Sequence, residues 1–218
     1  LIAAKLNGAD AIIVPRPFDD ENGLLSSAGM PAELLLPWRT TAAMLGGAQY
    51  IGKIRLPNNS DNCVFVQPDG QCVMVVWNSR PTREVLYLGS KVQLFDMMGC
   101  SRAAPMRGKE QVVDVGPNPT FVLGLNESIA RWRMNVRFDR TRIPSIFSKP
   151  HHNSLTFKNY FPQGVGGSVK IVVVDRDSMM VKNSKENVIS PGFAIDRWTI
   201  EPPQTSFQLA SDTEMRFP

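Results

Sequence analysis

The sequence predicts a mostly β chain with antiparallel strands, preceded by a shorter segment that contains helices. From residue 49 to residue 125, short runs of strand-forming residues alternate in polarity and are separated by Pro, Gly, Asn, Asp and Ser. Such regular short strands are typical of an antiparallel β-sandwich or barrel. Before them, residues 34–45 repeat apolar side chains at helical spacing and stop at Gly46-Gly47, a pair suited to the left-handed end of a helix.

Composition and charge are those of a packed chain without a membrane span. The 218 residues are 43% hydrophobic and 20% charged, enough for one large domain or two modest ones. The net charge of +4 comes from Lys and Arg spread along the chain, so we predict no nucleic-acid partner. No apolar run approaches the roughly 18 residues that a membrane helix needs. The chain does not begin with Met, so we expect it to be a fragment, and its compartment and oligomeric state stay open.

The first 48 residues are predicted as helix, turn, strand, loop and helix. Residues 1–6 have the pattern of a helix end, and Ala11–Val14 is a short apolar run of the kind found in buried parallel strands. Residues 15–33 are polar and contain glycine, which indicates a loop. The apolar face of the second helix is predicted to consist of Leu34, Leu35, Trp38, Ala42 and Leu45.

The stretch PWRTTAAMLGGAQYIG resembles the last helix of a (β/α)8-barrel glycoside hydrolase where it runs into a C-terminal β-sandwich. The resemblance implies that residues 1–48 are the C-terminal strand and helix of such a barrel. The loop at residues 15–33 would then lie on the active-site face. Glycosidases use two carboxylates on different strands, so the resemblance places the catalytic residues upstream of residue 1.

Arg16, Asp19 and Asp20, with Glu21 beside them, are the candidate site residues of this loop. Their functional interpretation is accessory binding of carbohydrate hydroxyls at the mouth of the barrel, because charged groups orient polyols through paired hydrogen bonds. The alternative is a solvated loop without a ligand. One loop cannot display both carboxylates of a glycosidase, so no catalytic residue is assigned, and neither a cofactor nor a metal is predicted.

Residues 49–127 are predicted to form one β-sandwich domain. Residues 73–77 should be central because both faces are apolar, and residues 84–88 should lie nearer an edge. The stretches KVQLFDMMGC and EQVVDVGPNPTFVLGL are similar to the small β-sandwich that follows the barrel in many retaining glycoside hydrolases. The strand-like runs are 50–56, 63–67, 71–77, 84–88, 92–97, 111–115 and 120–125.

Aromatic and cysteine residues of this domain are interpreted as core. Trp77, Phe95 and Phe121 could stack on sugars, but each lies in an alternating strand, where an aromatic side chain usually fills the interior. A tight turn at residues 67–70 would pair Cys72 with residue 66 or 67 and leave Cys63 out of register. We therefore expect no disulfide between them and interpret both as small buried hydrophobes.

Residues 128–218 are predicted to form a second β module. Residues 131–138 alternate apolar and cationic side chains, which predicts an amphipathic strand whose arginines face water or an acidic ligand. His151 and His152 are adjacent, so they would point to opposite faces of a strand, and we interpret them as loop residues that bind no metal. Pro144 and Pro150 interrupt the chain between residues 131–138 and these histidines.

The stretch SLTFKNYFPQGVGGSVKIVVVD resembles the Ig-like module appended to some α-galactosidases, the NPCBM-associated type. Two departures from the family pattern stand out: the link at residues 175–196 is longer, and the last strands are missing, which implies a truncated module. The matching residues are Asn159, Phe161, Pro162, Gly164, Val165, Gly167 and Val169, then Trp198, Thr199, Ile200, Pro202, Phe207, Leu209, Glu214 and Phe217.

These resemblances imply the non-catalytic C-terminal part of a glycoside hydrolase that acts on oligo- or polysaccharides. Its partner would be the carbohydrate substrate of the parent enzyme, and such enzymes are often exported. The alternative is a structural or adhesion protein built of Ig-like modules. Residues 1–48 distinguish the two hypotheses, because an adhesin has no use for an isolated strand and helix of a barrel.

Overall fold

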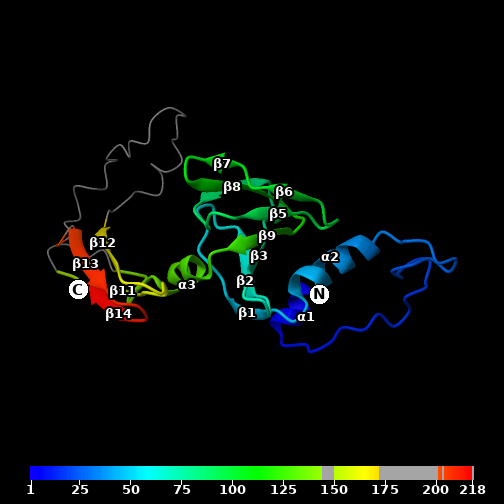
Figure 1. Cartoon of the computed structure of the whole chain (residues 1–218), viewed down its shortest axis with the longest axis horizontal. Helices are drawn as coiled ribbons and strands as arrows, with labels where there is room; N and C mark the ends of the chain where they lie inside the picture. Colours follow the sequence, from blue (N-terminus) through cyan, green and yellow to red (C-terminus); the bar gives the residue numbers. More distant parts are fainter. Residues whose placement is uncertain (144–149, 172–200, 203, 218) are drawn as a thin grey trace. The chain divides into compact units, whose positions relative to one another are not determined.

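The computed structural model describes residues 1–143, 150–171, 201–202 and 204–217. The chain divides into two compact units, Leu1–Arg137 and Phe138–Pro218 (Figure 1). Strands outnumber helices in the described residues, and the paired strands are antiparallel. The predicted mostly β, antiparallel fold class is therefore confirmed.

The first unit contains two antiparallel sheets and three helices. Its helices are α1 (Ile2–Leu6), α2 (Leu35–Leu45) and α3 (Glu127–Asn135). Its strands are β1 (Gln49–Gly52), β2 (Asp61–Val66), β3 (Cys72–Trp77), β4 (Thr82–Leu86), β5 (Gln93–Phe95), β6 (Ser101–Ala103), β7 (Met106–Arg107), β8 (Glu110–Val115) and β9 (Thr120–Leu125). The six-stranded sheet has the order β1-β2-β3-β9-β5-β6, and the three-stranded sheet has the order β4-β8-β7. Strand β3 is central and β4 lies at an edge, as predicted.

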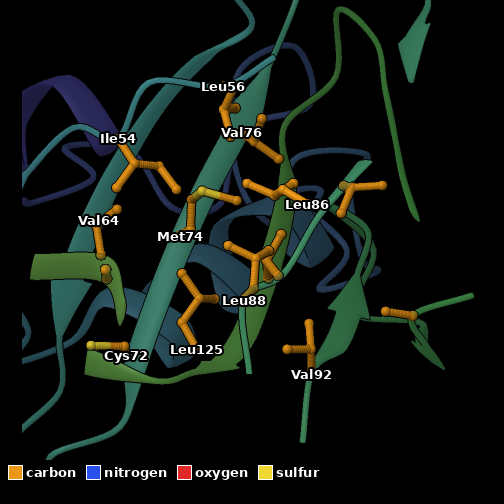
Figure 2. Packing of buried hydrophobic residues seen from close by; sticks show 14 of the residues in the cluster. Ile54, Leu56, Val64, Cys72, Met74, Val76, Leu86, Leu88, Val92 and Leu125 are labelled. Carbon is orange, nitrogen blue, oxygen red and sulfur yellow. The ribbon is translucent and has the colours of Figure 1, made fainter. Parts of the chain in front are cut away.

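One core lies between these two sheets. Met74 and Val76 on β3 are 1% and 0% exposed, and Leu86 at the end of β4 is 2% exposed. Figure 2 shows these side chains gathered together, with Leu88 beside them. Burying one such aliphatic side chain stabilises a fold by about 1.5–3 kcal/mol, so this cluster holds the two sheets together.

The opposite face of the six-stranded sheet is covered by the N-terminal helices. Phe65 and Phe121 are fully buried there against Leu45, the last residue of α2, and α1 packs on the same cluster. Helix α2 ends at the predicted glycine pair, where Gly47 has a φ of +67° that favours glycine. Covering both faces of the sheet explains why β3 is apolar on both sides.

The turn between β2 and β3 pairs Cys72 with Val66, one of the two partners that the sequence predicts. Cys63 pairs with Val75 instead. Cys63 belongs to the core under the helices and Cys72 to the core between the sheets, so the two thiols lie on opposite faces of one sheet. Both cysteines are buried and free, and they pack as small hydrophobes.

Glu84 is a buried carboxylate that holds the loop before β2. It is 1% exposed. It accepts hydrogen bonds from the Ser60 hydroxyl at 2.7 Å, the Ser60 N–H at 3.2 Å and the Asn58 N–H at 2.9 Å. These three donors satisfy a buried carboxyl group that would otherwise lack hydrogen-bond partners.

Two buried amides hold other irregular segments in the same way. Asn62 accepts from the Ile54 N–H at 2.9 Å and donates to the Ile54 carbonyl at 2.7 Å. Gln111 accepts from the Leu88 N–H at 2.8 Å and donates to the Gly89 carbonyl at 2.6 Å. Each amide thus replaces hydrogen bonds that a regular strand would have supplied.

Strand β1 is an edge strand that ends in an irregularity. Its register with β2 shifts between Tyr50 and Gly52, and Gly52 has a φ of +142°. A Cβ at Gly52 would lie 3.0 Å from the Met134 Sδ atom of α3. Glycine is therefore needed here both for its backbone conformation and for the close approach of the helix.

The second unit is smaller and built around phenylalanines. Phe157 lies 5.2 Å from Phe217 and 5.0 Å from Phe207, measured between ring centroids. Asn159, 1% exposed, donates to the Gln163 carbonyl at 3.0 Å and so closes the turn after β11. Its strands are β10 (Arg137–Phe138), β11 (Leu155–Lys158), β12 (Val165–Lys170), β13 (Gln204–Leu209) and β14 (Glu214–Phe217), in sheets of order β10-β11-β14 and β12-β13. Trp198, Thr199, Ile200 and the long link at 175–196 lie outside the described residues.

The predicted buried strand at Ala11–Val14 does not form. Ile12 is 40% exposed and Ile13 84% exposed, and these residues pair with no strand among the described part of the chain. A parallel strand of this kind needs hydrogen-bonded neighbours and helices over both faces, and an apolar run cannot supply them itself.

The predicted strand at residues 131–138 is wrong over most of its length, because residues 127–135 form helix α3. Asn126 caps the helix by accepting a hydrogen bond from the Ile129 N–H at 3.0 Å. Ala130 is buried in the core between the sheets, and Met134 packs on it. The strand was predicted from the alternation at residues 131–138 alone. That pattern includes neither the cap nor Ala130, which lies four residues before Met134, as on one face of a helix.

Candidate functional site

The loop at residues 15–33 is ordered by its own carboxylates. The Asp19 side chain accepts hydrogen bonds from the Glu21 N–H at 3.1 Å and the Asn22 N–H at 2.8 Å. Gly23 folds back on the same residue, and a Cβ there would lie 2.5 Å from the Asp19 backbone nitrogen. The Asp19 carboxylate therefore has a structural role as the acceptor of a tight turn.

Asp20 fixes the far side of the loop. Its carboxylate accepts from the Ser27 N–H at 2.8 Å and from the Ser27 hydroxyl at 2.9 Å. The backbone bond, and after it the hydroxyl bond, lower the pKa of Asp20 below its ordinary value of 3.8. The side chain is thus ionised at neutral pH and already engaged within the loop.

The structure brings two of the three candidate residues together. Arg16 and Asp19 line an open hollow of about 260 Å³ with Val14, Pro15 and Asn22. Asp20 is not part of its lining, because it bonds to Ser27 on another side of the loop. A guanidinium and a carboxylate in a shallow hollow can bind hydroxyl groups, whereas acid–base hydrolysis would require a second carboxylate at a fixed distance.

Other side chains that the sequence singled out for chemistry lie in the core or in loops. Phe121 is fully buried, and Trp77 and Phe95 pack against the core under the helices, which confirms their interpretation as core residues. His151 and His152 lie outside the regular elements. Within the described residues, no group of three or more His, Cys, Asp or Glu side chains has the arrangement of a metal site.

A second feature of the N-terminal segment was not predicted, and we name it the apolar face. It consists of exposed large hydrophobic residues in the loop and on α2, with Ile13, Met30 and Phe18 exposed to 84%, 64% and 60%. Its members are Ile12, Ile13, Phe18, Met30, Leu34 and Leu36. A single exposed hydrophobic residue is ordinary, whereas six in one segment of 25 residues favour an interaction site.

The prediction for the buried side of α2 was only partly correct. Leu45 is buried and Trp38 half-buried, but Leu34 is 54% exposed and Ala42 is exposed too, whereas Thr40 is buried. A Cβ at Gly99 would lie 3.0 Å from the Thr40 hydroxyl, so the tip of the β5–β6 hairpin seats on this helix. Because α2 is apolar on most of its surface, its periodicity could not identify the side that packs on the sheet. The lack of a polar face was the signal that α2 also contacts something besides the sheet.

No protein-family model matches the chain, and no curated protein matches it. Among solved structures, the chain is similar to a family 39 glycoside hydrolase from the gut symbiont Bacteroides cellulosilyticus WH2, with a TM-score of 0.40 and 20% sequence identity. The match covers 48% of this chain and 22% of that structure, so the chain spans less than a quarter of its length. A TM-score of this size does not establish a common fold.

Among the described residues, no helix combines the length and apolar character required to cross a membrane.

Proposed function

We propose that this chain is the non-catalytic, β-rich C-terminal part of a glycoside hydrolase acting on oligo- or polysaccharides. In this proposal residues 1–48 complete a (β/α)8 barrel, residues 49–127 form a β-sandwich that stabilises it, and residues 128–218 are an Ig-like module that spaces further modules. The resemblance of the stretch PWRTTAAMLGGAQYIG to the end of a glycosidase barrel supports it. The substrate is then the carbohydrate of the parent enzyme, and Arg16 and Asp19 are accessory contacts to it.

The apolar face is the observation that carries the proposal. Its side chains come from two neighbouring parts of the chain, the loop at 12–30 and the start of α2. Water-exposed apolar area is lost favourably at about 25 cal/mol per Å², so a second protein body against this face would stabilise the assembly.

The alternative is a structural or adhesion protein built from β-sandwich modules. Its supporting observation is the small second unit with its phenylalanine core. The apolar face favours the glycosidase proposal, because modules of an adhesin are joined by polar linkers and do not require an apolar N-terminal surface.

The first experiment is to read the coding sequence upstream of residue 1 and to express the longer protein. We expect a barrel with an acid and a nucleophile at the ends of separate strands, and hydrolysis of aryl glycosides only by the longer protein. An upstream sequence without a barrel contradicts the proposal, as does turnover by the 218-residue chain itself.

A matched pair of variants then tests the apolar face. Leu36 on α2 and Tyr87 after β4 are exposed to 43% and 41%. In the isolated chain, Leu36→Asp and Tyr87→Asp should each change the melting temperature little. In the longer protein only Leu36→Asp should destabilise, because it would bury an unpaired charge. Equal effects of the two variants there would remove the main support for the proposal.

A further inference from the structure

The tip of the β5–β6 hairpin, residues 97–100, lies against α2 within the first unit (Figure 1). Gly99 has a φ of +89°, and a Cβ at this position would lie 3.0 Å from the hydroxyl oxygen of Thr40. Glycine is therefore needed here both for its backbone conformation and for the close approach of the helix. This contact joins the hairpin tip and the middle of α2 in one surface.

The tip presents sulfur-containing side chains where polar residues are usual. Turns are normally built from Gly, Pro, Asn, Asp and Ser, whereas three of the four residues here are Met97, Met98 and Cys100. Met98 is 51% exposed, Cys100 is exposed too, and none of the four residues is charged. Methionine is enriched at surfaces where proteins bind other proteins.

Hydrogen bonds to Asp96 hold the backbone of the tip in place. The Oδ1 atom of Asp96 accepts hydrogen bonds from the Met98 N–H and the Cys100 N–H, both at 2.9 Å. The Asp96 carbonyl accepts a third, from the Gly99 N–H at 3.1 Å. A backbone that is already held loses little conformational freedom on docking, so less of the contact energy of Met98 is offset.

Met98 lies close to one member of the apolar face. Leu36 precedes Thr40 by one helical turn, so the two residues share a side of α2 and their Cβ atoms are about 6 Å apart. Leu36 is 43% exposed, whereas Thr40, which Gly99 approaches, is 7% exposed. Exposed apolar side chains therefore flank this contact on the helix and on the hairpin.

We propose that residues 97–100 belong to the same docking surface as Leu36 and are covered by the polypeptide that the proposed function places before residue 1. The inference rests on the proposed function and adds to it that the β-sandwich itself, and not only residues 1–48, contacts the barrel. An uncharged tip suits an apolar protein surface, because nucleic acid would require cations for its phosphates.

The position of α1 supports this choice of partner. Ile2 and Leu6 pack on the same core cluster as Leu45, the last residue of α2. A helix of 11 residues is only about 16 Å long. A chain that continues before α1 would therefore begin close to the point where the hairpin meets α2.

The reactivity of Cys100 tests the proposal directly. Cys100 is exposed, whereas Cys63 and Cys72 are buried. Its rate of modification by iodoacetamide is measured by peptide mass spectrometry in the 218-residue chain and in the longer protein with its upstream barrel. We expect the rate to be about tenfold or more lower in the longer protein, because a covered thiol reacts only when the contact opens.

A matched pair of methionine variants keeps the test independent of the thiol. Met98 and Met106 are exposed to 51% and 56%, and Met106 lies on β7 in the other sheet. In the 218-residue chain, Met98→Asp and Met106→Asp should each change the melting temperature little. In the longer protein only Met98→Asp should lower the melting temperature and restore the reaction of Cys100, because it would bury an unpaired charge.

Three results would overturn the proposal. The first is an equal Cys100 rate in the two proteins, and the second is an equal effect of the two methionine variants. The third is a Cys100 rate that falls as the concentration of the 218-residue chain rises, which would identify a second copy as the partner. If Leu36→Asp still destabilises the longer protein, the proposed function stands and only this inference fails; if Leu36→Asp has no effect either, or no barrel precedes residue 1, both fail.

Discussion

Replacing Glu84 should show how much of the first unit depends on one buried carboxylate. Glu84 lies on β4, and its three hydrogen bonds all reach the segment at Asn58–Ser60, more than twenty residues earlier in the chain. Glu84→Ala removes the acceptor for all three donors. Glu84→Gln keeps the shape of the side chain and one acceptor oxygen. The other oxygen becomes an NH₂ group that faces a backbone N–H, so two donors meet and no hydrogen bond forms there.

The expected cost follows from what each donor can do without Glu84. Ser60 is 5% exposed, so its N–H and its hydroxyl would be left without an acceptor, at about 1–3 kcal/mol each. Asn58 is exposed, and its N–H can bond to water instead. Glu84→Ala should therefore lower the free energy of unfolding by about 3–5 kcal/mol, and Glu84→Gln by about 1–2 kcal/mol.

Urea denaturation of the full chain at neutral pH, followed by tryptophan fluorescence, would measure these differences. Glu33→Ala is the control, because Glu33 is an exposed glutamate of the same unit and its loss should change stability by no more than about 0.5 kcal/mol. If Glu84→Ala were no more destabilising than Glu33→Ala, the carboxylate would not hold the Asn58–Ser60 loop as described.

Two further predictions concern titratable groups. Because the folded pKa of Asp20 is depressed, its bonds to Ser27 stabilise the loop fully above pH 3.8 and are lost as the pH falls through the folded pKa. The stability gap between the unmodified chain and Asp20→Asn should therefore shrink below about pH 4, and a gap constant from pH 7 to pH 2 would contradict this. Of the thiols, Cys100 is exposed, whereas burial raises the pKa of Cys63 and raises that of Cys72 to about 11. A thiol reagent at pH 8 should modify one cysteine in the folded chain and three in denaturant; rapid modification of all three would show that the sheet is open.

The sandwich was predictable because its signals are local. Alternating apolar residues and glycine- or proline-containing turns identified the strands. Turn length limited the partner of Cys72 to residue 66 or 67, and the structure has Val66. The long-range polar contacts could not be found in this way. Glu84, Asn62 and Gln111 look like ordinary polar strand residues, and only the fold shows which distant backbone groups they satisfy.

The errors in the N-terminal segment and in α3 have a common physical cause. Ala11–Val14 was predicted as a strand from its composition, but a strand requires partners that composition does not reveal. Residues 131–138 alternate in polarity, yet the Asn126 cap and the burial of Ala130 determine a helix. Arg16 and Asp19 were correctly placed in one loop, but whether they contact a carbohydrate remains a prediction.

The irregular end of β1 bears on how this chain avoids self-association. An edge strand offers unpaired N–H and C=O groups that another molecule can extend into a larger sheet. In β1 the regular ladder is broken after Tyr50, and Met134 of α3 lies against the kinked backbone at Gly52. The regular part of this edge is therefore short, and an incoming strand would find only a brief template on it. Register irregularities of this kind are one way in which edge strands resist the addition of further strands.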